Sequence, residues 1–362
     1  MTITGAPRVP GGPDARTVLG LVGGFIGATA PDGRRLTPVQ HAVVHAITRA
    51  MTGFDVVFDD VEPLTSDELA ALLADRPVAF RSRITQVIVL SELVLHPLTP
   101  EVAARVETYA RALGVDEDMV RVARRYSEGA LGLAWVDLRR LGFLERWRPE
   151  HSTPLHARAS CADPFEEDAS DAALAERWMA FEHYDPDTLG RAVWEFYRAR
   201  GFHFPGTPGS ASPYLAQHDF VHVLADYGSC IPNEFEVFAM CGRADPEPKG
   251  FAWLAMIIGL FESGFVHGQA LFEMDLSRKW LEEPGMDERL ADAMYRGSVC
   301  GRDLFVVDYH ELADRPLADV RELLGIVPKS PEAIAAGSVG PGHPDGISAF
   351  QLAAGRRLVA AG

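Results

Sequence analysis

A short run beyond the middle of the chain constrains its fold more than any other feature. Residues 218–222 read His-Asp-Phe-Val-His, and Glu234 follows after eleven intervening residues. Side chains four apart lie on one face of a helix, because each residue turns the helix by about 100°. His218 and His222 would then point the same way, with Asp219 at the edge of that face. Two imidazoles and one or two carboxylates from adjacent elements form a divalent-metal site.

Helix-boundary signals around the run support this geometry. Pro213 is typical of a first helical residue, five positions before the first histidine. Asn233 and Glu236 have the spacing of a capping box, which predicts that a second helix starts there and that Glu236 is occupied with the cap. Glu234, in the first turn of this second helix, is then free to face His222. The sequence therefore predicts that the site is shared between two consecutive helices.

The same residues match the hallmark of a known family. His218, Asp219, His222 and Glu234 follow the pattern His-Asp-x-x-His, eleven residues, Glu of the coenzyme Q biosynthesis protein 4 family. The chain resembles this family over about residues 165–330. The family usually has Leu-Gly before the distant Glu, where this chain has Pro-Asn, so we expect a different turn at that point. Flanking segments similar to the family lie at 187–192, 301–304 and 316–326.

The resemblance implies a protein of ubiquinone or related isoprenoid-quinone biosynthesis. Its substrate would be a prenylated aromatic ring, and its reaction would replace a ring carboxyl by hydroxyl in an oxidative decarboxylation. The resemblance also implies other biosynthetic enzymes as partners and contact with a membrane surface. We therefore expect a cytoplasmic protein that touches the bilayer peripherally, and we keep a homodimer among the assemblies considered.

The residues alone leave the chemistry open. Two imidazoles and carboxylates fit Zn²⁺, which is the first expectation, and they also fit Fe(II) held by two histidines and one carboxylate. Asp219, beside His218, is the candidate general base. Three functions remain: a metal enzyme of quinone biosynthesis, a metal-dependent hydrolase acting on an unrelated small molecule, and a non-catalytic organiser. The organiser would bind prenyl lipid and partner enzymes around a structural metal.

Composition narrows the partners and the compartment. The net charge of -17 argues against a nucleic-acid partner, which would need a basic surface. The four cysteines show no CxxC spacing, so they predict a reducing compartment rather than a disulfide framework. Cys230 lies between the two predicted helices, where a buried structural thiol is favoured over a metal ligand. No segment reaches the 18 or more apolar residues of a membrane span.

The predicted fold is all-α, with two helical domains joined by a Pro-rich linker at residues 148–170. We expect a loose N-terminal segment over 1–37, with a short buried or lipid-touching helix over 17–30. A helical domain over 38–147, a metal-binding helical domain over 165–330 and a flexible tail over 331–362 are expected to follow. The first domain is similar to the TerB-like helical domains of tellurite resistance. Its predicted helices are 38–51, 66–74, 80–95, 100–113 and 117–141.

Two further features carry weaker hypotheses. The apolar run at 251–261 is predicted either to pack inside the core or to line a channel for an isoprenoid tail. His41 and His45 share a helical face in the first domain, and Asp55 follows. A core face beside a solvated acidic turn is the favoured interpretation of these histidines, over a second metal site.

Overall fold

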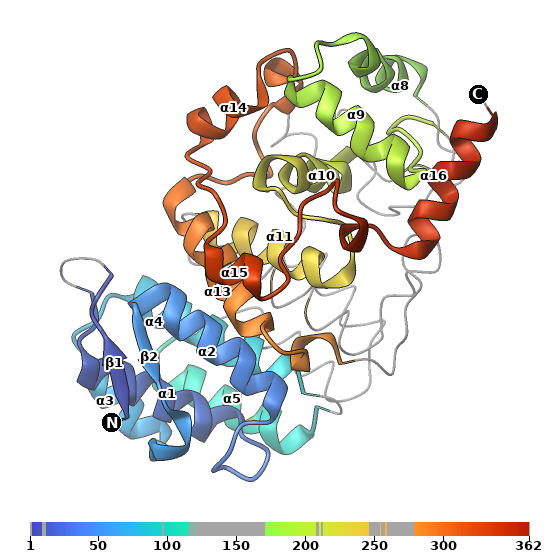
Figure 1. Ribbon diagram of the computed structural model, residues 1–362. Helices are drawn as coiled ribbons and strands as arrows, with labels where there is room; N and C mark the ends of the chain where they lie inside the picture. Colours follow the sequence, from blue (N-terminus) through green and yellow to red (C-terminus); the bar gives the residue numbers. More distant parts are fainter. Residues whose placement is uncertain are drawn as a thin grey trace.

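The chain folds almost entirely into α-helices, as the computed structural model in Figure 1 shows. The structure describes residues 2–8, 12–95, 98–115, 120, 171–207, 210, 213–245, 254, 258 and 279–361. In these residues, strands are limited to a two-stranded ribbon in which β1 (Ile3–Gly5) pairs antiparallel with β2 (Phe54–Val56). The prediction of an all-α fold is confirmed.

Capping residues set the limits of the N-terminal helices. Thr37 and Gln40 form a capping box at the start of α2, and Thr65 and Glu68 form another at the start of α3. The predicted helices from 38 to 113 agree with the structure to within two residues at either end, whereas 117–141 lies almost entirely outside the described residues. The elements are α1 (Ala15–Thr29), α2 (Pro38–Thr52), η1 (Phe58–Asp60), α3 (Ser66–Leu72), α4 (Val78–Leu93) and α5 (Pro100–Ala112).

The segment expected to be loose over 1–37 contains α1, close to the short helix predicted over 17–30. Asp14 caps α1, and this helix contributes fully buried residues such as Val18 and Val22 to the core. Its glycines let it lie directly against the backbone that precedes α3. A Cβ on Gly27 would come within 2.3 Å of the carbonyl oxygen of Leu64. The glycines of α1 therefore allow close packing and are not a sign of flexibility.

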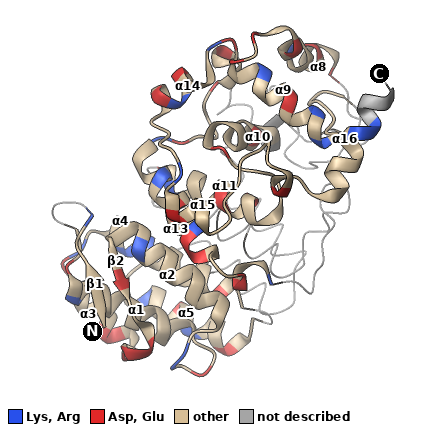
Figure 2. Cartoon of the chain, in the orientation of Figure 1, with Lys and Arg blue, Asp and Glu red and all other residues tan. Residues whose placement is uncertain are grey.

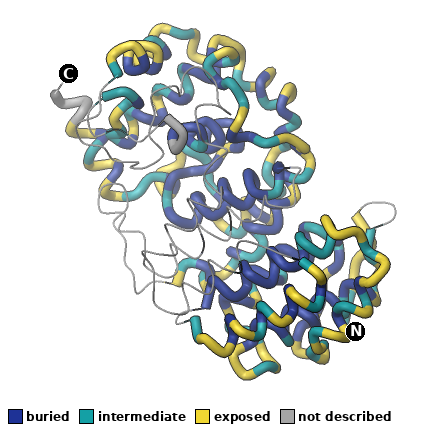
Figure 3. Tube along the Cα trace, turned by 180° about the vertical axis from the view of Figure 1, so that it is seen from behind, coloured by how far each residue is buried: buried dark blue, intermediate teal, exposed yellow. Residues whose placement is uncertain are grey.

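The helices that follow pack in the spatial order α9, α10, α11, α13, α2. Residues 231–242 of α11 are all buried, which makes this helix the centre of the described fold (Figure 3). The predicted linker at 148–170 lies outside the described residues. The elements are α8 (Ala172–Met179), η5 (Ala180–His183), α9 (Leu189–Arg200), α10 (Pro213–Ala225), α11 (Ile231–Ala244), η6 (Trp280–Glu282), α13 (Met286–Cys300), η7 (Tyr309–Leu312) and α14 (Leu317–Leu324).

The expectation of a flexible tail over 331–362 is wrong for residues 331–361. They form α15 (Pro331–Ala335), η8 (Pro344–Gly346) and α16 (Ala349–Ala361), and α16 packs against α9. A Cβ on Gly355 would lie 2.2 Å from the carbonyl oxygen of Ala199, so the two helices touch through backbone. Small residues that suggest a loose tail in the sequence instead allow this close approach.

Figure 2 shows charged residues on helices throughout the described chain, among them α8, α9, α13 and α14. The central helices α10 and α11 are mainly uncharged, so their acidic side chains are exceptional in their surroundings. Among the described residues, no helix has both the length and the apolar character needed to cross a bilayer.

Candidate metal centre

The four predicted ligands come from two consecutive helices. His218, Asp219 and His222 lie on α10, which begins where the sequence predicts. Glu234 lies in the first turn of α11. Asp226 follows α10 with a left-handed φ of 61°, which turns the chain back towards α11. The short connection brings the start of α11 against the last turns of α10.

The start of α11 corrects the predicted capping box. The N-cap is Cys230 rather than Asn233, because Pro232 fits the first turn of a helix and lets the helix begin earlier. Asn233 and Glu236 therefore lie inside the helix. Glu236 Oε2 accepts hydrogen bonds from Asn233 Nδ2 at 2.8 Å and from Arg289 Nη2 at 2.7 Å. Glu236 thus belongs to a buried ion pair between α11 and α13 and does not cap its own helix.

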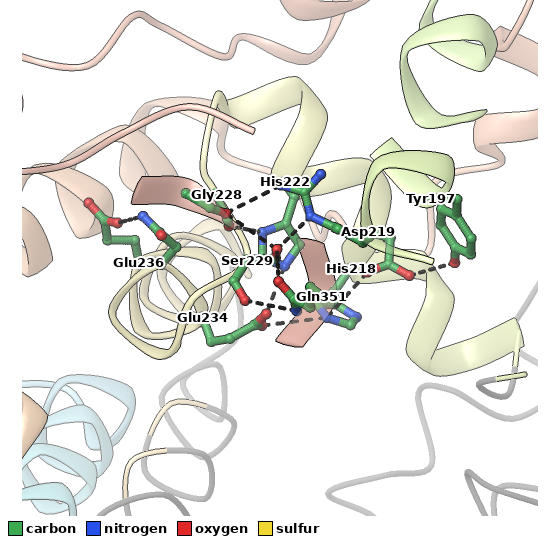
Figure 4. Close-up of polar contacts among 12 residues, drawn as sticks. Tyr197, His218, Asp219, His222, Gly228, Ser229, Glu234, Glu236 and Gln351 are labelled. Carbon is green, nitrogen blue, oxygen red and sulfur yellow. Dashed lines mark hydrogen bonds and ion pairs between the residues drawn. The ribbon is translucent and has the colours of Figure 1, made fainter. Parts of the chain in front are cut away.

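The predicted ligands lie close together (Figure 4). Oε2 of Glu234 is 3.5 Å from Nε2 of His218 and 3.3 Å from Nε2 of His222. Oδ1 of Asp219 is 3.6 Å from Nε2 of His218. One ligand atom from each of His218, Asp219 and His222 lies within 4.8 Å of the others. The geometry that the spacing predicts for the two helices is therefore present.

In its neutral form, His222 presents an unprotonated nitrogen to this cluster. Its Nδ1 is 2.6 Å from the carbonyl oxygen of Gly228, and a carbonyl can only accept, so the proton of the neutral ring lies on Nδ1. The Nε2 atom is buried and has no hydrogen-bond partner in the described chain, although it lies 3.3 Å from Glu234 Oε2. A lone pair and a carboxylate repel each other at this distance unless a cation, either a proton or a metal ion, lies between them.

The two acidic side chains differ in their electrostatics. Burial acts to raise the pKa of Glu234, but His222 and His218, in their protonated and positively charged form, outweigh it and lower this pKa to about 2. Burial dominates at Asp219 and raises its pKa, against the opposing effects of the two histidines and of Tyr197. Glu234 is therefore the more firmly ionised of the two carboxylates and the stronger anionic partner for a cation.

Helix α9 holds the cluster from the side opposite α11. The hydroxyl of Tyr197 donates to Oδ2 of Asp219 at 2.5 Å, and both residues are buried. The ring of Phe196 stacks on His222 with centroids 5.4 Å apart, and Phe238 of α11 stacks on His218 at 5.5 Å. Each ligand on α10 is thus oriented by a hydrogen bond or a ring contact.

The donor set fits a divalent metal. Two imidazoles and two carboxylates match the ligands of Zn²⁺ and of Fe(II), and the hydrogen bond from His222 to Gly228 is the usual way in which a metal-binding histidine is oriented. Cys230 is no part of the set, because its thiol donates to the carbonyl oxygen of Asp345 at 3.4 Å. Burial raises the pKa of this thiol, which agrees with a structural role.

Two supporting residues were not predicted from the sequence. Tyr197 lies on another helix, 22 residues before its partner Asp219, and no local spacing links the two. Gly228 acts through its carbonyl oxygen, which every residue type possesses. The glycine itself is needed because a Cβ there would lie 2.5 Å from Cα of Gly346. This steric contact is what marks Gly228 as special, and it exists only once the C-terminal residues have folded against the loop.

The second histidine pair belongs to an interface between helices. His45 Nε2 is 3.0 Å from Asp55 Oδ1, and its Nδ1 is 3.3 Å from Asp287 Oδ2 at the start of α13. His41 stacks on His45 with centroids 5.7 Å apart. Among the described residues, the cluster around His218 is the one group of three or more metal-binding side chains close enough to share an ion.

The assignment of the site rests on the motif and on the geometry of its side chains. The motif supplies the four donors, and the fold gathers His218, Asp219 and His222, with Glu234 3.3–3.5 Å from the two histidines. No protein-family model matches the chain, and no curated protein matches it significantly.

Proposed function

We propose that His218, Asp219, His222 and Glu234 bind one divalent metal ion, with Zn²⁺ as the first expectation and Fe(II) as the alternative. The buried Nε2 of His222 carries this proposal. Its ring is held by Gly228 so that its lone pair faces the ionised carboxylate of Glu234 at 3.3 Å. A metal ion between the two atoms would remove their repulsion and satisfy both.

We further propose that the chain acts in isoprenoid-quinone biosynthesis, on a prenylated ring that carries a carboxyl group. The motif and its flanking segments support this proposal through their similarity to the coenzyme Q biosynthesis protein 4 family. With dioxygen as the oxidant, the carboxyl would leave as CO₂ and one oxygen atom would enter the ring as hydroxyl. A two-electron reductant and two protons would convert the other oxygen atom to water. A bound metal would supply Lewis acidity or, if it is iron, activation of dioxygen.

In this reaction His218, His222 and Glu234 would hold the metal, which leaves Asp219 beside it as the proposed proton carrier. Its Oδ1 lies beside the cluster, 3.6 Å from Nε2 of His218, while its Oδ2 is held by the hydroxyl of Tyr197. One oxygen is therefore fixed and the other faces the space shared by the histidines. This arrangement suits a carboxylate that receives and returns a proton beside a bound ring.

The substrate tail is proposed to lie along the apolar run at 251–261. Burying each methylene contributes about 0.8 kcal/mol, so a long tail could supply most of the binding free energy. Leu254 and Ile258 are fully buried, and the other residues of this run lie outside the described residues. A charged residue in place of Ile257 should weaken binding of a prenyl phosphate. Unchanged binding would contradict the proposal that the tail lies along residues 251–261.

A second candidate is a non-catalytic organiser in which the metal is structural. The observation that favours it is the burial of the donors, with side-chain exposures of 1% for His222 and 5% for Glu234. A fully protein-ligated ion would have no open position for substrate. In this case the protein would bind prenyl lipid, partner enzymes and the bilayer surface without itself changing the ring.

The decisive experiment is metal analysis of the purified protein, together with extraction of lipids that copurify with it. We expect about one equivalent of zinc or iron and a lipid with an isoprenoid tail. A metal with no prenylated lipid and no binding of prenyl phosphate would overturn the quinone proposal. A protein that takes up no divalent metal would overturn the metal centre itself.

A further inference from the structure

The C-terminal segment (residues 338–351) lies against the loop that connects α10 to α11. The N–H of Gly228 donates to the carbonyl of Val339 at 3.0 Å, and the N–H of Ser229 donates to the carbonyl of Gly346 at 2.7 Å. Ser229 Oγ donates to Gln351 Oε1 at 2.9 Å, and Gln351 Nε2 donates back to the carbonyl of Ser229 at 3.3 Å. The loop is therefore bonded to this segment by backbone and side chain together.

Steric contact adds to these bonds. Gly228 and Gly346 touch through backbone, since a Cβ on Gly228 would lie 2.5 Å from Cα of Gly346 and 2.6 Å from its carbonyl oxygen. The loop can approach the segment this closely only because both residues lack a side chain. The position of the Gly228 peptide is thus set by contacts that come from more than a hundred residues further along the chain.

A buried arginine ties the same contact to α9. The guanidinium of Arg200 donates through Nε to Ser229 Oγ, and through Nη2 to the carbonyls of Pro341 at 2.8 Å and Gly346 at 3.3 Å. Arg200 is 1% exposed, so these bonds are shielded from water. Helix α9, the loop and the C-terminal segment therefore form one network in which Ser229 is the shared residue.

We infer that the C-terminal segment positions His222 for metal binding, with Gln351 as a positioning residue. The carbonyl of Gly228 accepts the Nδ1 proton of His222, and so fixes both the tautomer and the orientation of the ring. The segment holds this carbonyl in place through its bonds to Gly228 and Ser229. This inference rests on the proposed metal centre and adds the C-terminal residues to it.

The test compares two substitutions at the start of α16. Gln351→Leu removes the side-chain bonds to Ser229. Ser348→Ala removes the hydroxyl that accepts the N–H of Gln351 at 3.1 Å, and so weakens the start of the same helix while leaving the bonds to Ser229. Both variants and the wild-type full chain are titrated with Zn²⁺ against a competing chelator. They are also loaded with Co²⁺, whose visible absorption reports the geometry of its ligands.

We expect Gln351→Leu to weaken Zn²⁺ binding about 10-fold, the lower end of the usual effect of residues that orient a ligand, and to change the Co²⁺ spectrum. Ser348→Ala should leave the affinity and the spectrum unchanged, even if the unfolding midpoint falls. Equal losses in the two variants, or no change in Gln351→Leu, would overturn the inference. If Gln351→Leu does not fold, Ser229→Ala removes the hydroxyl that bonds Gln351 and Arg200 from the loop side, and a 2-fold or greater weakening is expected.

The failure of this inference can be told apart from the failure of the metal centre. A wild-type protein that binds neither Zn²⁺ nor Co²⁺ overturns the proposed function and the inference together. A wild-type protein that binds both ions, with Gln351→Leu and Ser229→Ala indistinguishable from it, overturns the inference alone.

Discussion

Glu234 and Glu236 are two residues apart on α11 and point to opposite sides of it, as Figure 4 shows. Glu234 faces the histidines of α10, whereas Glu236 faces Arg289 of α13. Two residues correspond to about 200° of helix rotation, so neighbouring carboxylates can serve separate purposes. The pair therefore allows the metal centre and the core to be tested separately on one helix.

The first prediction concerns Glu234. Glu234→Gln keeps the shape of the side chain and removes the ionised carboxylate, so metal affinity should fall by at least about 100-fold while the helical circular dichroism stays unchanged. Isothermal titration with Zn²⁺ measures the affinity. The matched control is Glu236→Gln, which should keep the wild-type affinity in the fraction that remains folded. Equal affinity in wild type and Glu234→Gln would remove Glu234 from the site.

The second prediction concerns Glu236. Glu236→Gln leaves the guanidinium of Arg289 buried without its countercharge, which should lower the free energy of unfolding by about 3 kcal/mol. Urea unfolding measures this change. Glu195→Gln is the control, because it removes the partner of Arg191 in an ion pair at the surface and should leave stability almost unchanged. Similar small effects in both variants would contradict the assigned importance of the buried pair.

The donors of the site could be predicted from the sequence, but the residues that orient them could not. The i, i+4 spacing of His218 and His222 is a property of any helix, and it survives errors in the helix ends. Tyr197 reaches Asp219 from α9, and Gly228 acts through its backbone. Contacts of these kinds depend on tertiary packing and leave no periodic pattern in the chain.

Among the elements, helix starts were predictable where a side chain caps its own helix, as at Thr37 and Thr65. The start of α11 was not, because Asn233 and Glu236 have capping-box spacing but bond each other and Arg289 inside the helix. The capping-box spacing shows only which hydrogen bond Glu236 could make within its own helix. In the structure the carboxylate of Glu236 instead binds the buried guanidinium of Arg289 from α13.

The third prediction concerns pH and the contact between α2 and α13. The hydrogen bond to Asp287 raises the pKa of His45 above its ordinary value of 6.5, against the effect of burial and with further help from Asp55. The pairing of protonated His45 with Asp287 and Asp55 therefore stabilises the fold fully below pH 6.5, and this stabilisation is lost as the pH rises through the folded-state pKa of His45. The neighbouring His41 has the opposite effect on the pH dependence of stability, because burial lowers the pKa of His41.

Comparison with His45→Gln isolates this contribution. The difference in unfolding free energy between wild type and variant should be about 0.5–1 kcal/mol near pH 6 and should shrink towards about pH 9. Chemical denaturation across this range provides the measurement. A difference that stays constant or grows with pH would contradict the assigned pairing of His45 with Asp287 and Asp55.

The fourth prediction concerns the packing of α11 on α13. A Cβ on Gly297 would lie 2.2 Å from the carbonyl oxygen of Met240, so Gly297→Ala must push the helices apart. We expect a loss of about 1–3 kcal/mol in unfolding free energy, despite the better helix propensity of alanine. The control is Gly342→Ala, where a Cβ would meet no atom within 4 Å and stability should hold. A stabilising Gly297→Ala would show that these helices lie further apart.

At the scale of the whole molecule, composition was a poor guide to the C-terminal end of the chain. The small residues of α16 suggest a mobile segment, yet they let Gly355 approach Ala199 through backbone, as Gly27 of α1 approaches Leu64. The sequence alone does not distinguish a glycine in a flexible segment from a glycine in a tight contact. The distinction depends on whether another backbone segment lies against the glycine in the folded chain.

The fifth prediction concerns removal of the metal from the full chain. We expect the large helical core to fold without the ion. Dialysis against a chelator should then leave the far-ultraviolet circular dichroism unchanged and lower the thermal midpoint only by the free energy of metal binding that is lost. Restoring Zn²⁺ should restore the midpoint. Cooperative unfolding on chelation would instead favour the organiser with a structural metal, at the expense of the enzyme.

The most direct test of the metal centre is anomalous diffraction at the zinc edge from crystals grown with Zn²⁺. The account predicts one strong peak about 2.0–2.2 Å from Nε2 of His218, Nε2 of His222 and a carboxylate oxygen of Glu234. It would be contradicted by the absence of a peak at this position, with His222 Nε2 in direct hydrogen-bond contact with Glu234.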